Sequence, residues 1–209
     1  AMDRIDCYIF DRIDSMGDAQ LAQALAAVSP ARRSKALSYV NAIDRKLSVA
    51  AELLLRRALR DMCISQLPRI AEGEYGKPYF PDSPHLHFSI SHCRLCVACA
   101  VSAKPIGIDV ECIDSYAPDL AEAVLNAQEQ REVLASPSPA EAFVRYWTMK
   151  ESYLKLTGTG LTDDLPNLLS PMPQAWFHST VCPKGYVATV CAYAASDAEM
   201  HDCEISELI

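Results

Sequence analysis

The sequence predicts an α+β fold, because its strand-like segments form hairpin-like pairs and its helical segments cluster between those pairs. A chain of 209 residues, 50% of them apolar, can bury a substantial core. No apolar run approaches the roughly 18–20 residues that cross a bilayer, and the N-terminus resembles no secretory signal. We therefore expect a cytoplasmic protein with reduced thiols and no membrane partner.

In the first half, a short apolar strand is followed by helices and then by paired strands. Ser29 is a suitable N-cap, and Pro30 suits the first position of a helix. Within residues 44–62, apolar side chains recur at helical spacing. The strands predicted in this half are residues 7–10, 86–90 and 96–101.

The second half repeats this mixture of elements. A helix is expected over residues 119–134, and Ser138-Pro139-Ala140-Glu141 is a capping box that opens the next helix, which Gly158 ends. The strands predicted here are residues 106–110, 176–180, 186–193 and 203–208. We therefore expect two α+β halves, at residues 1–103 and 104–209.

The charge balance bears on the class of partner. A net charge of −8, from 27 acidic and 19 basic residues, disfavours nucleic acid, because attraction to phosphates along a strand needs the opposite balance. Local groups of basic residues can still bind a small polyphosphate. We therefore expect no nucleic-acid partner.

Three of the nine cysteines, Cys93, Cys96 and Cys99, follow one another at intervals of three residues. An iron–sulfur cluster would need a fourth cysteine and a proline soon after this run, and a zinc finger would need a second pair of ligands. Residues 101–103 are Val-Ser-Ala instead. We interpret the three cysteines as thiols packed on a strand.

The segment Gly107-Ile108-Asp109-Val110-Glu111 predicts a strand with two carboxylates on one side. Residues two apart on a strand point to the same side, so Asp109 and Glu111 converge while Ile108 and Val110 face the core. Neighbouring carboxylates repel unless a cation lies between them, and oxygen-only ligands favour Mg²⁺. The alternative explanation is the solvated outer face of a strand.

A second polar group lies on the helix that contains Trp147. Trp147, Lys150 and Leu154 fall on one stripe, which places the Lys150 ammonium in an apolar face where it needs a partner. Glu151 and Lys155 lie one turn apart at the edge of that stripe. A surface ion pair would explain these two residues but not Lys150. A third carboxylate for a cation, with a lysine for a phosphate oxygen, explains the group better.

In the first half, Ser91 and His92 follow directly after a predicted strand. A hydroxyl and an imidazole in that place, together with backbone N–H groups, often meet a phosphate. Basic residues occur in the same half, although each taken singly is more often an ordinary surface charge. These basic residues are Arg32, Lys35, Arg45 and Lys77.

Together these residues resemble the Sfp-type 4′-phosphopantetheinyl transferases. Three signatures carry the resemblance, in the order that the family has them, over about residues 29–161. They are Gly76-Lys77-Pro78 with Phe88-Ser89-Ile90-Ser91-His92, then Gly107-Ile108-Asp109-Val110-Glu111, then Trp147-x-x-Lys150-Glu151-Ser152-x-x-Lys155.

The resemblance implies a pseudo-dimer of two similar α+β halves that acts as a monomer and binds coenzyme A between the halves. It implies a Mg²⁺-dependent holo-[carrier protein] synthase. Such an enzyme moves the 4′-phosphopantetheine group of coenzyme A to a serine of an apo acyl or peptidyl carrier protein and releases adenosine 3′,5′-bisphosphate. Carriers of this kind serve fatty-acid, polyketide and nonribosomal-peptide biosynthesis, and which carrier is the target stays open.

The resemblance also implies roles for individual residues. Glu129 or Glu151 would accept the proton of the carrier serine, and Lys155 would stabilise the pyrophosphate. The metal ligands would be Asp109, Glu111 and Glu151. The coenzyme A contacts would come from Arg32, Lys35, Arg45, Lys77, Ser91, His92 and Lys155, with Arg45 and His92 on the 3′-phosphate.

Two other functions stay open from the sequence. One is a Mg²⁺-dependent transferase acting on another nucleotide, which would bind coenzyme A and 3′-dephospho-coenzyme A alike. The other is a nucleotide-binding or partner-docking module without catalysis, which would bind coenzyme A tightly and transfer nothing.

Overall fold

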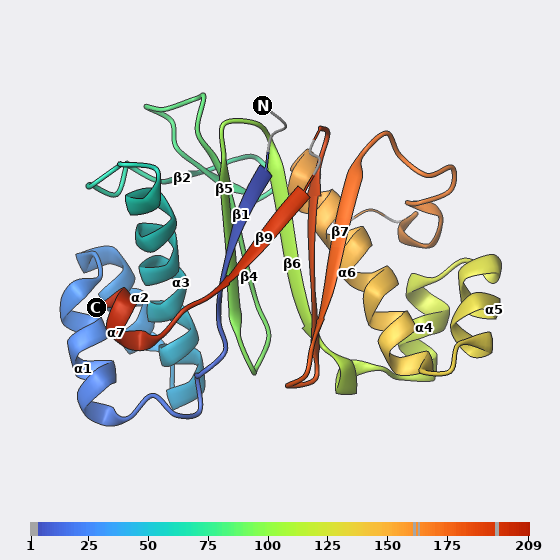
Figure 1. Cartoon of the computed structure of the whole chain (residues 1–209), viewed down its shortest axis with the longest axis horizontal. Coiled ribbons are helices and arrows are strands. Elements are labelled where there is room, and N and C mark those ends of the chain that lie inside the picture. Colours follow the sequence, from blue (N-terminus) through green and yellow to red (C-terminus); the bar gives the residue numbers. More distant parts are fainter. Residues whose placement is uncertain (1–3, 161, 163, 195–196) are drawn as a thin grey trace.

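The computed structural model describes residues 4–160, 162, 164–194 and 197–209. Helices and sheets are mixed as the sequence predicts, which confirms the α+β class. Two sheets pack together in the middle of the molecule, and a long helix covers the outer side of each (Figure 1). These helices are α3 (Ala42–Asp61) and α6 (Pro139–Thr157). No helix among the described residues has an apolar stretch of the length that a membrane requires.

The first half begins with a strand and three helices and ends with a hairpin. Its elements are β1 (Arg4–Phe10), α1 (Asp18–Ala27), α2 (Pro30–Ser38), α3, β2 (Ala71–Glu72), β3 (Pro78–Tyr79), β4 (His87–His92) and β5 (Val97–Ser102). Ser29 caps α2 as predicted, because its Oγ accepts a hydrogen bond from the backbone N–H of Arg32. Helix α1 was not predicted, since its apolar periodicity is weak and Ala24 is its buried residue.

The second half again has a strand, helices and a hairpin. Its elements are β6 (Ile106–Cys112), η1 (Ile113–Ser115), α4 (Pro118–Val124), α5 (Ala127–Ala135), α6, η2 (Leu165–Asn167), β7 (Trp176–Cys182) and β8 (Tyr186–Ala192). Strand β9 (Asp197–Asp202) and helix α7 (Ile205–Leu208) follow. Gly158 ends α6 in the left-handed conformation, at φ 71°, as predicted.

The prediction of one helix over residues 119–134 is wrong, because the chain breaks after Val124 and begins a new helix at Ala127. Asn126 causes this break. Its Oδ1 accepts hydrogen bonds from the backbone N–H groups of Gln128 and Glu129, which makes it the N-cap of α5. The predicted capping box at Ser138 is also wrong, since the Ser138 side chain makes no cap bond, although α6 does begin at the next residue.

The prediction of a strand over residues 203–208 is wrong as well. Residues Ile205–Leu208 form a helical turn, and the strand lies before it at Asp197–Asp202. Glu207 closes the turn by accepting a hydrogen bond from the backbone N–H of Glu204. Leu208 is buried against the core beside α3. The apolar residues that suggested a strand therefore reach the core from one side of a helical turn.

The two halves share the order of one strand, three α-helices and a hairpin, with the same strand pairing, although the first half also contains β2 and β3. In the first half, β1 is antiparallel to β5, which is antiparallel to β4. In the second half, β6 is antiparallel to β8, which is antiparallel to β7. Strand β9 then returns to the first sheet, where it lies parallel to β1. The last described strand therefore completes the sheet of the other half.

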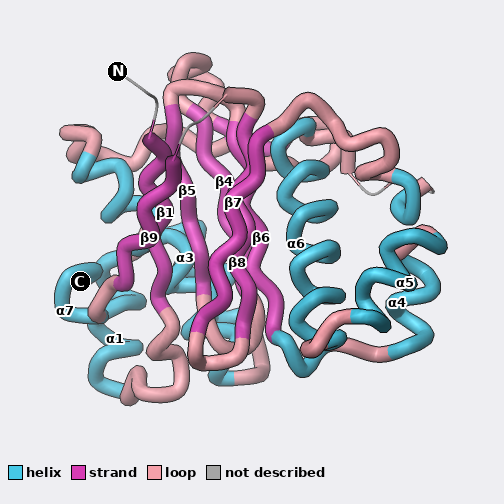
Figure 2. Tube along the Cα trace, turned by 45° about the vertical axis from the view of Figure 1, so that its right-hand side comes forward, coloured by secondary structure: helices cyan, strands magenta, loops and turns pink. Residues whose placement is uncertain are grey.

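The core has a layer between each sheet and its helices and a layer between the sheets. On β1, the alternate residues Tyr8 and Phe10 pack toward α3, whereas Cys7 and Ile9 pack toward the second sheet. On β6, Ile108 is one of the residues that meet them from the other side. Alternation along a strand thus joins both halves in one hydrophobic layer. The strands of the two sheets lie side by side between the helices (Figure 2).

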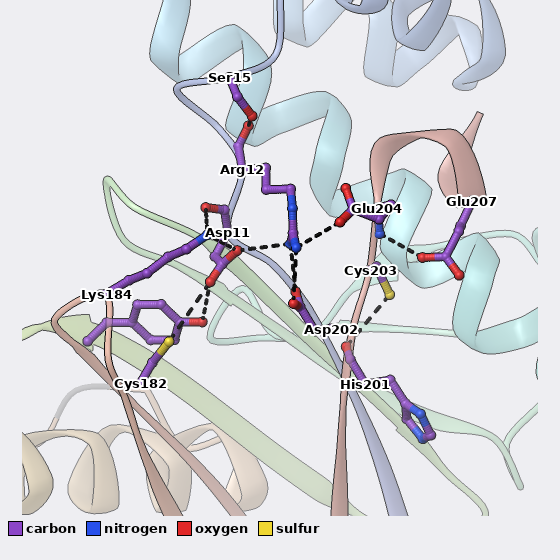
Figure 3. A network of polar contacts seen from close by, with 11 residues as sticks. Asp11, Arg12, Ser15, Cys182, Lys184, His201, Asp202, Cys203, Glu204 and Glu207 are labelled. Carbon is purple, nitrogen blue, oxygen red and sulfur yellow. Dashed lines mark hydrogen bonds and ion pairs between the residues drawn. The ribbon is translucent and has the colours of Figure 1, made fainter.

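Polar contacts around Asp11 join the end of β1 to the β7–β8 hairpin (Figure 3). The Asp11 carboxylate is only 6% exposed, and it accepts hydrogen bonds from Lys184 Nζ at 2.6 Å and from the Tyr186 hydroxyl at 3.0 Å. The neighbouring Arg12 pairs with Asp202, at the end of β9, at 2.9 Å. The network thus joins β1 and β9, which belong to one sheet, to the β7–β8 hairpin of the other sheet.

We expect Asp11→Asn to lower the free energy of unfolding by about 1–2 kcal/mol, because it removes the charge that Lys184 and Tyr186 share. Unfolding in urea measures this loss. The control is Asp82→Asn, which removes an exposed pair with Arg69 and should leave stability unchanged. Equal losses in the two variants would show that the Asp11 network does not hold the halves together.

Candidate active site

A cavity of about 470 Å³ lies where the segment before β3, strand β4 and helix α6 meet. Glu151 and Lys155 line it from α6, Ser89 lines it from β4, and Tyr75 and Lys77 line it from the segment before β3. Helix α6 runs along β6, the strand that carries the predicted metal ligands (Figure 2). Both halves of the chain therefore contribute walls to the cavity.

Gly107 allows β6 and α6 to approach one another closely. A Cβ atom at this position would lie 1.9 Å from the Ser152 carbonyl oxygen and 2.6 Å from the Leu156 backbone nitrogen. The face of β6 that carries Gly107 is thus pressed against the helix. Because residues two apart share a face of a strand, Asp109 and Glu111 point to the same side as Gly107, toward α6.

Asp109 is the centre of a hydrogen-bonded group at the edge of this contact. Its carboxylate is buried, and Oδ1 accepts from Lys155 Nζ at 2.6 Å and from Ser91 Oγ at 2.7 Å. Lys155 Nζ also donates to Ser91 Oγ, at 2.8 Å. Residues from β4, β6 and α6 thus meet at one point, as the predicted signatures require.

Glu151 and Glu111 add two further carboxylates. Burial is the main cause that raises the pKa of Glu151, and the negative charges of Asp109 and Glu111 raise it further, while Lys155 acts in the opposite direction. Glu111 is half-buried, and its Oε1 accepts a hydrogen bond from Ser115 Oγ at 2.8 Å. The charges of Asp109 and Glu111 thus act on the Glu151 carboxyl group in the same direction as its burial.

His92, at the end of β4, lies between this group and the beginning of α3. Desolvation and the positive charge of Lys155 lower the pKa of His92, whereas Asp44, Glu111 and Asp109 raise it. Asp44 is in the first turn of α3, next to the predicted phosphate ligand Arg45. The imidazole is therefore near residues of both halves.

The other basic residues predicted for coenzyme A differ in their surroundings. Lys77 lines the cavity and donates from Nζ to the Leu156 carbonyl oxygen at 3.0 Å, and desolvation lowers the pKa of Lys77. Arg45 donates from Nε to the Tyr39 carbonyl oxygen at 2.7 Å. Lys35 is exposed on α2. Arg32, on the same helix, has Glu52 as its ion-pair partner, at 3.8 Å.

Lys150 points into the layer formed by α4, α5 and η2. Its ammonium is fully buried and donates to Glu129 Oε2 at 2.6 Å and to the Val124 carbonyl oxygen at 2.8 Å. The carbonyl oxygens of Leu165 and Pro166 lie at 3.1 and 2.8 Å. Burial lowers the pKa of Lys150, and Glu129 opposes that shift. The partner of the Lys150 ammonium is therefore the carboxylate of Glu129 inside the fold, and not a phosphate.

Residues 105–195 match a family model described as the 4′-phosphopantetheinyl transferase superfamily. A 4′-phosphopantetheinyl transferase from Bacillus subtilis is 34% identical over 142 residues, which are 66% of this chain and 63% of that protein. The transferase AcpT from Salmonella typhi is 31% identical over 173 residues, 80% of this chain and 81% of that protein. The chain belongs to this superfamily.

A third relative is the 4′-phosphopantetheinyl transferase Sfp from Bacillus subtilis (strain 168), which is 32% identical over 142 residues. The match covers 63% of the length of each of the two Bacillus proteins, which is less than two thirds. It covers 66% of this chain.

Two features of this superfamily member were missed in the sequence. Ser115 holds Glu111 through a hydrogen bond, but a serine four residues after a glutamate forms no recognisable pattern. Gly160 lines the cavity at φ 71°, and a Cβ there would lie 3.1 Å from Tyr75 Cβ. The available signal for Gly160 was a second glycine shortly after the one that ends α6.

We expect Gly107→Ala to lower the free energy of unfolding by about 2–3 kcal/mol, because the added methyl group meets the backbone of α6 rather than a movable side chain. Unfolding in urea measures the loss. In the control Gly17→Ala, a Cβ has no atom within 4 Å, and the loss should be smaller. Equal stability of wild type and Gly107→Ala would show that the strand–helix spacing has no such constraint.

Proposed function

We propose that the protein transfers the 4′-phosphopantetheine group of coenzyme A to a serine of an apo carrier protein and releases adenosine 3′,5′-bisphosphate. The observation that carries this proposal is the meeting of Asp109, Glu151 and Lys155 beside the cavity lined by β4 and α6. The relatives are named as transferases of this group. Since the Bacillus matches cover only part of those proteins, the activity is proposed rather than carried over.

The proposal includes the pseudo-dimer and a monomeric enzyme. The shared order of one strand, three α-helices and a hairpin, with the same strand pairing, supports the first. The second follows from the first, because one chain then carries both of the halves that wall the cavity. We place the enzyme in the cytoplasm, where the thiols that the structure contains would stay reduced.

The donor set fits Mg²⁺. Asp109, Glu111 and Glu151 offer carboxylate oxygens, which are the ligands that Mg²⁺ prefers. Burial raises the pKa of Glu151, the charges of Asp109 and Glu111 raise it further, and a divalent cation would offset this repulsion. Bound there, Mg²⁺ would supply positive charge against the pyrophosphate of coenzyme A.

Lys155 would hold the pyrophosphate from the protein side. Its ammonium is kept in place by Asp109 and Ser91, which use two of its three donors. The remaining donor is available to a phosphate oxygen. A lysine fixed in this way lowers the barrier because it need not reorganise as charge develops on the leaving group.

Lys77, Arg45 and His92 would bind the nucleotide end. Lys77 loses less hydration on binding an anion, because its ammonium is already partly desolvated. The lowered pKa of His92 means that the free protein holds it mainly neutral, and a neighbouring phosphate would favour its protonation. Arg32 and Lys35 stay predicted as outer contacts on α2.

The choice of proton acceptor follows from the surroundings of the two glutamates. Glu151 lines the cavity, where its carboxylate is open to the hydroxyl of a carrier serine. Glu129 is buried against the Lys150 ammonium. We therefore assign proton transfer to Glu151 and propose that Glu129 holds α5 against α6 through its ion pair with Lys150.

The activity test combines the protein, Mg²⁺, coenzyme A and apo carriers from fatty-acid, polyketide and peptide assembly. We expect one carrier serine to gain the mass of one phosphopantetheine group, and Asp109→Asn to reduce the rate at least about 100-fold. The matched control Asp202→Asn, an exposed carboxylate at the end of β9, should retain full activity. Absence of the mass gain on every carrier would argue against the proposed function.

A second comparison tests the proton acceptor. We expect Glu151→Gln to lower kcat by about 10²–10⁴-fold without loss of stability, because the amide cannot take the serine proton. Glu129→Gln should instead lower the free energy of unfolding by about 3 kcal/mol, because it leaves the buried Lys150 ammonium unpaired, while the folded fraction stays active. The reverse result, a stable but inactive Glu129→Gln, would assign the proton transfer to Glu129.

A further inference from the structure

Two thiols face one another in the turn that joins β4 to β5. Cys93 Sγ and Cys96 Sγ are 3.7 Å apart, and the Cys93 backbone N–H donates to the Cys96 carbonyl oxygen at 3.0 Å. This backbone bond closes the turn and holds the two residues opposite one another. The thiols are therefore placed by the hairpin and do not depend on mobile side chains.

The third cysteine of the run is separate from this pair. Cys99 packs in the core layer beside α3, whereas Cys93 and Cys96 pack in the layer between the sheets. Cys112, at the end of β6, lies in the same layer and forms a hydrogen bond with Cys93. The sequence run thus yields a pair of thiols, with another thiol contributed by the opposite sheet.

The two thiols of the pair differ in chemical character. The hydrogen bond from Cys96 is the main cause that lowers the pKa of Cys93 to about 7, although burial opposes it. Because Cys96 donates this hydrogen bond, the bond raises the pKa of Cys96, and burial raises it further. Cys93 is thus the thiol of the pair that loses its proton more easily, and Cys96 is the one that keeps it.

We propose that Cys93 and Cys96 form an oxidation site, at which a hydroperoxide converts the two thiols into a disulfide. The sulfur atoms must approach by about 1.7 Å to reach the S–S bond length of about 2.05 Å. The proposal does not depend on the transferase function, because it concerns the β4–β5 turn alone.

The reaction is balanced with hydrogen peroxide as the oxidant. The Cys93 thiolate attacks one oxygen, the O–O bond breaks, and hydroxide leaves with a proton as water, which gives a sulfenic acid on Cys93. Cys96 Sγ then attacks the Cys93 sulfur, the S–O bond breaks, and a second water leaves. Two thiols and one peroxide become one disulfide and two waters.

The position of Arg94 between the two cysteines gives a sharp test. After peroxide treatment of the native protein and alkylation of the remaining thiols, trypsin cuts after Arg94 and the protease Glu-C cuts after Glu111, which separates Cys112. The peptides that end at Arg94 and begin at Leu95 then stay together only if Cys93 is bonded to Cys96 or Cys99. We expect a linked pair with the mass of two hydrogens lost, which dithiothreitol separates. The control Cys99→Ala should give the same linked pair.

A second variant tests the order of steps without the disulfide. In Cys96→Ser/Cys112→Ser, the sulfenic acid on Cys93 cannot be resolved by either neighbour, so dimedone should trap it there. We expect Cys93 to react at least about ten times faster than Cys99. Recovery of Cys93 as a free thiol at peroxide doses that oxidise the exposed Cys63, or a bond from Cys93 to Cys112 instead, would overturn the proposal.

Discussion

The candidate site depends on how closely α6 lies on β6. Because residue 107 has no side chain, the Ser152 carbonyl oxygen can occupy the space that a Cβ would fill. At this spacing the carboxylate of Asp109 reaches the Lys155 ammonium at 2.6 Å, and the charges of Asp109 and Glu151 are near enough to repel. A larger separation would leave the same side chains on the same elements without a common site.

Local spacing was sufficient to predict which polar side chains share a face. Asp109 and Glu111 are two apart on a strand, and Glu151 and Lys155 are four apart on a helix, so each pair was assigned to one side of its own element. Spacing does not say which element lies opposite. The meeting of the two pairs was expected from the family resemblance, and the structure supplies its physical cause in the packing of β6 on α6.

The features that escaped prediction depend on contacts between distant segments. The apolar stripe around Lys150 indicated that its ammonium needs a partner, but Glu129 and the carbonyl oxygens of Leu165 and Pro166 meet it only after α4, α5 and η2 have packed. Strand β9, with the sequence DAEMHD, has little strand character of its own. Its parallel pairing with β1, nearly the whole chain away, makes it a strand.

The first half shows what the same topology does with other side chains. There the Tyr8 hydroxyl of β1 donates to Asp61 at the end of α3, at 2.9 Å, where the second half joins Asp109 of β6 to Lys155 of α6. A cavity of about 240 Å³ adjoins Tyr8 and Asp61. The first half differs further because β9 pairs along β1. From β9, His201 stacks on the Tyr8 ring, with the ring centroids 4.9 Å apart. On the helix-facing side of the first strand, a phenol bonded to a carboxylate thus stands where the second half has a carboxylate bonded to an ammonium. The acidic residues of the first sheet lie toward β9 instead, where Asp6 and Glu199 meet His201, so the chemistry of each half follows from this position and from the strand that lies beside it.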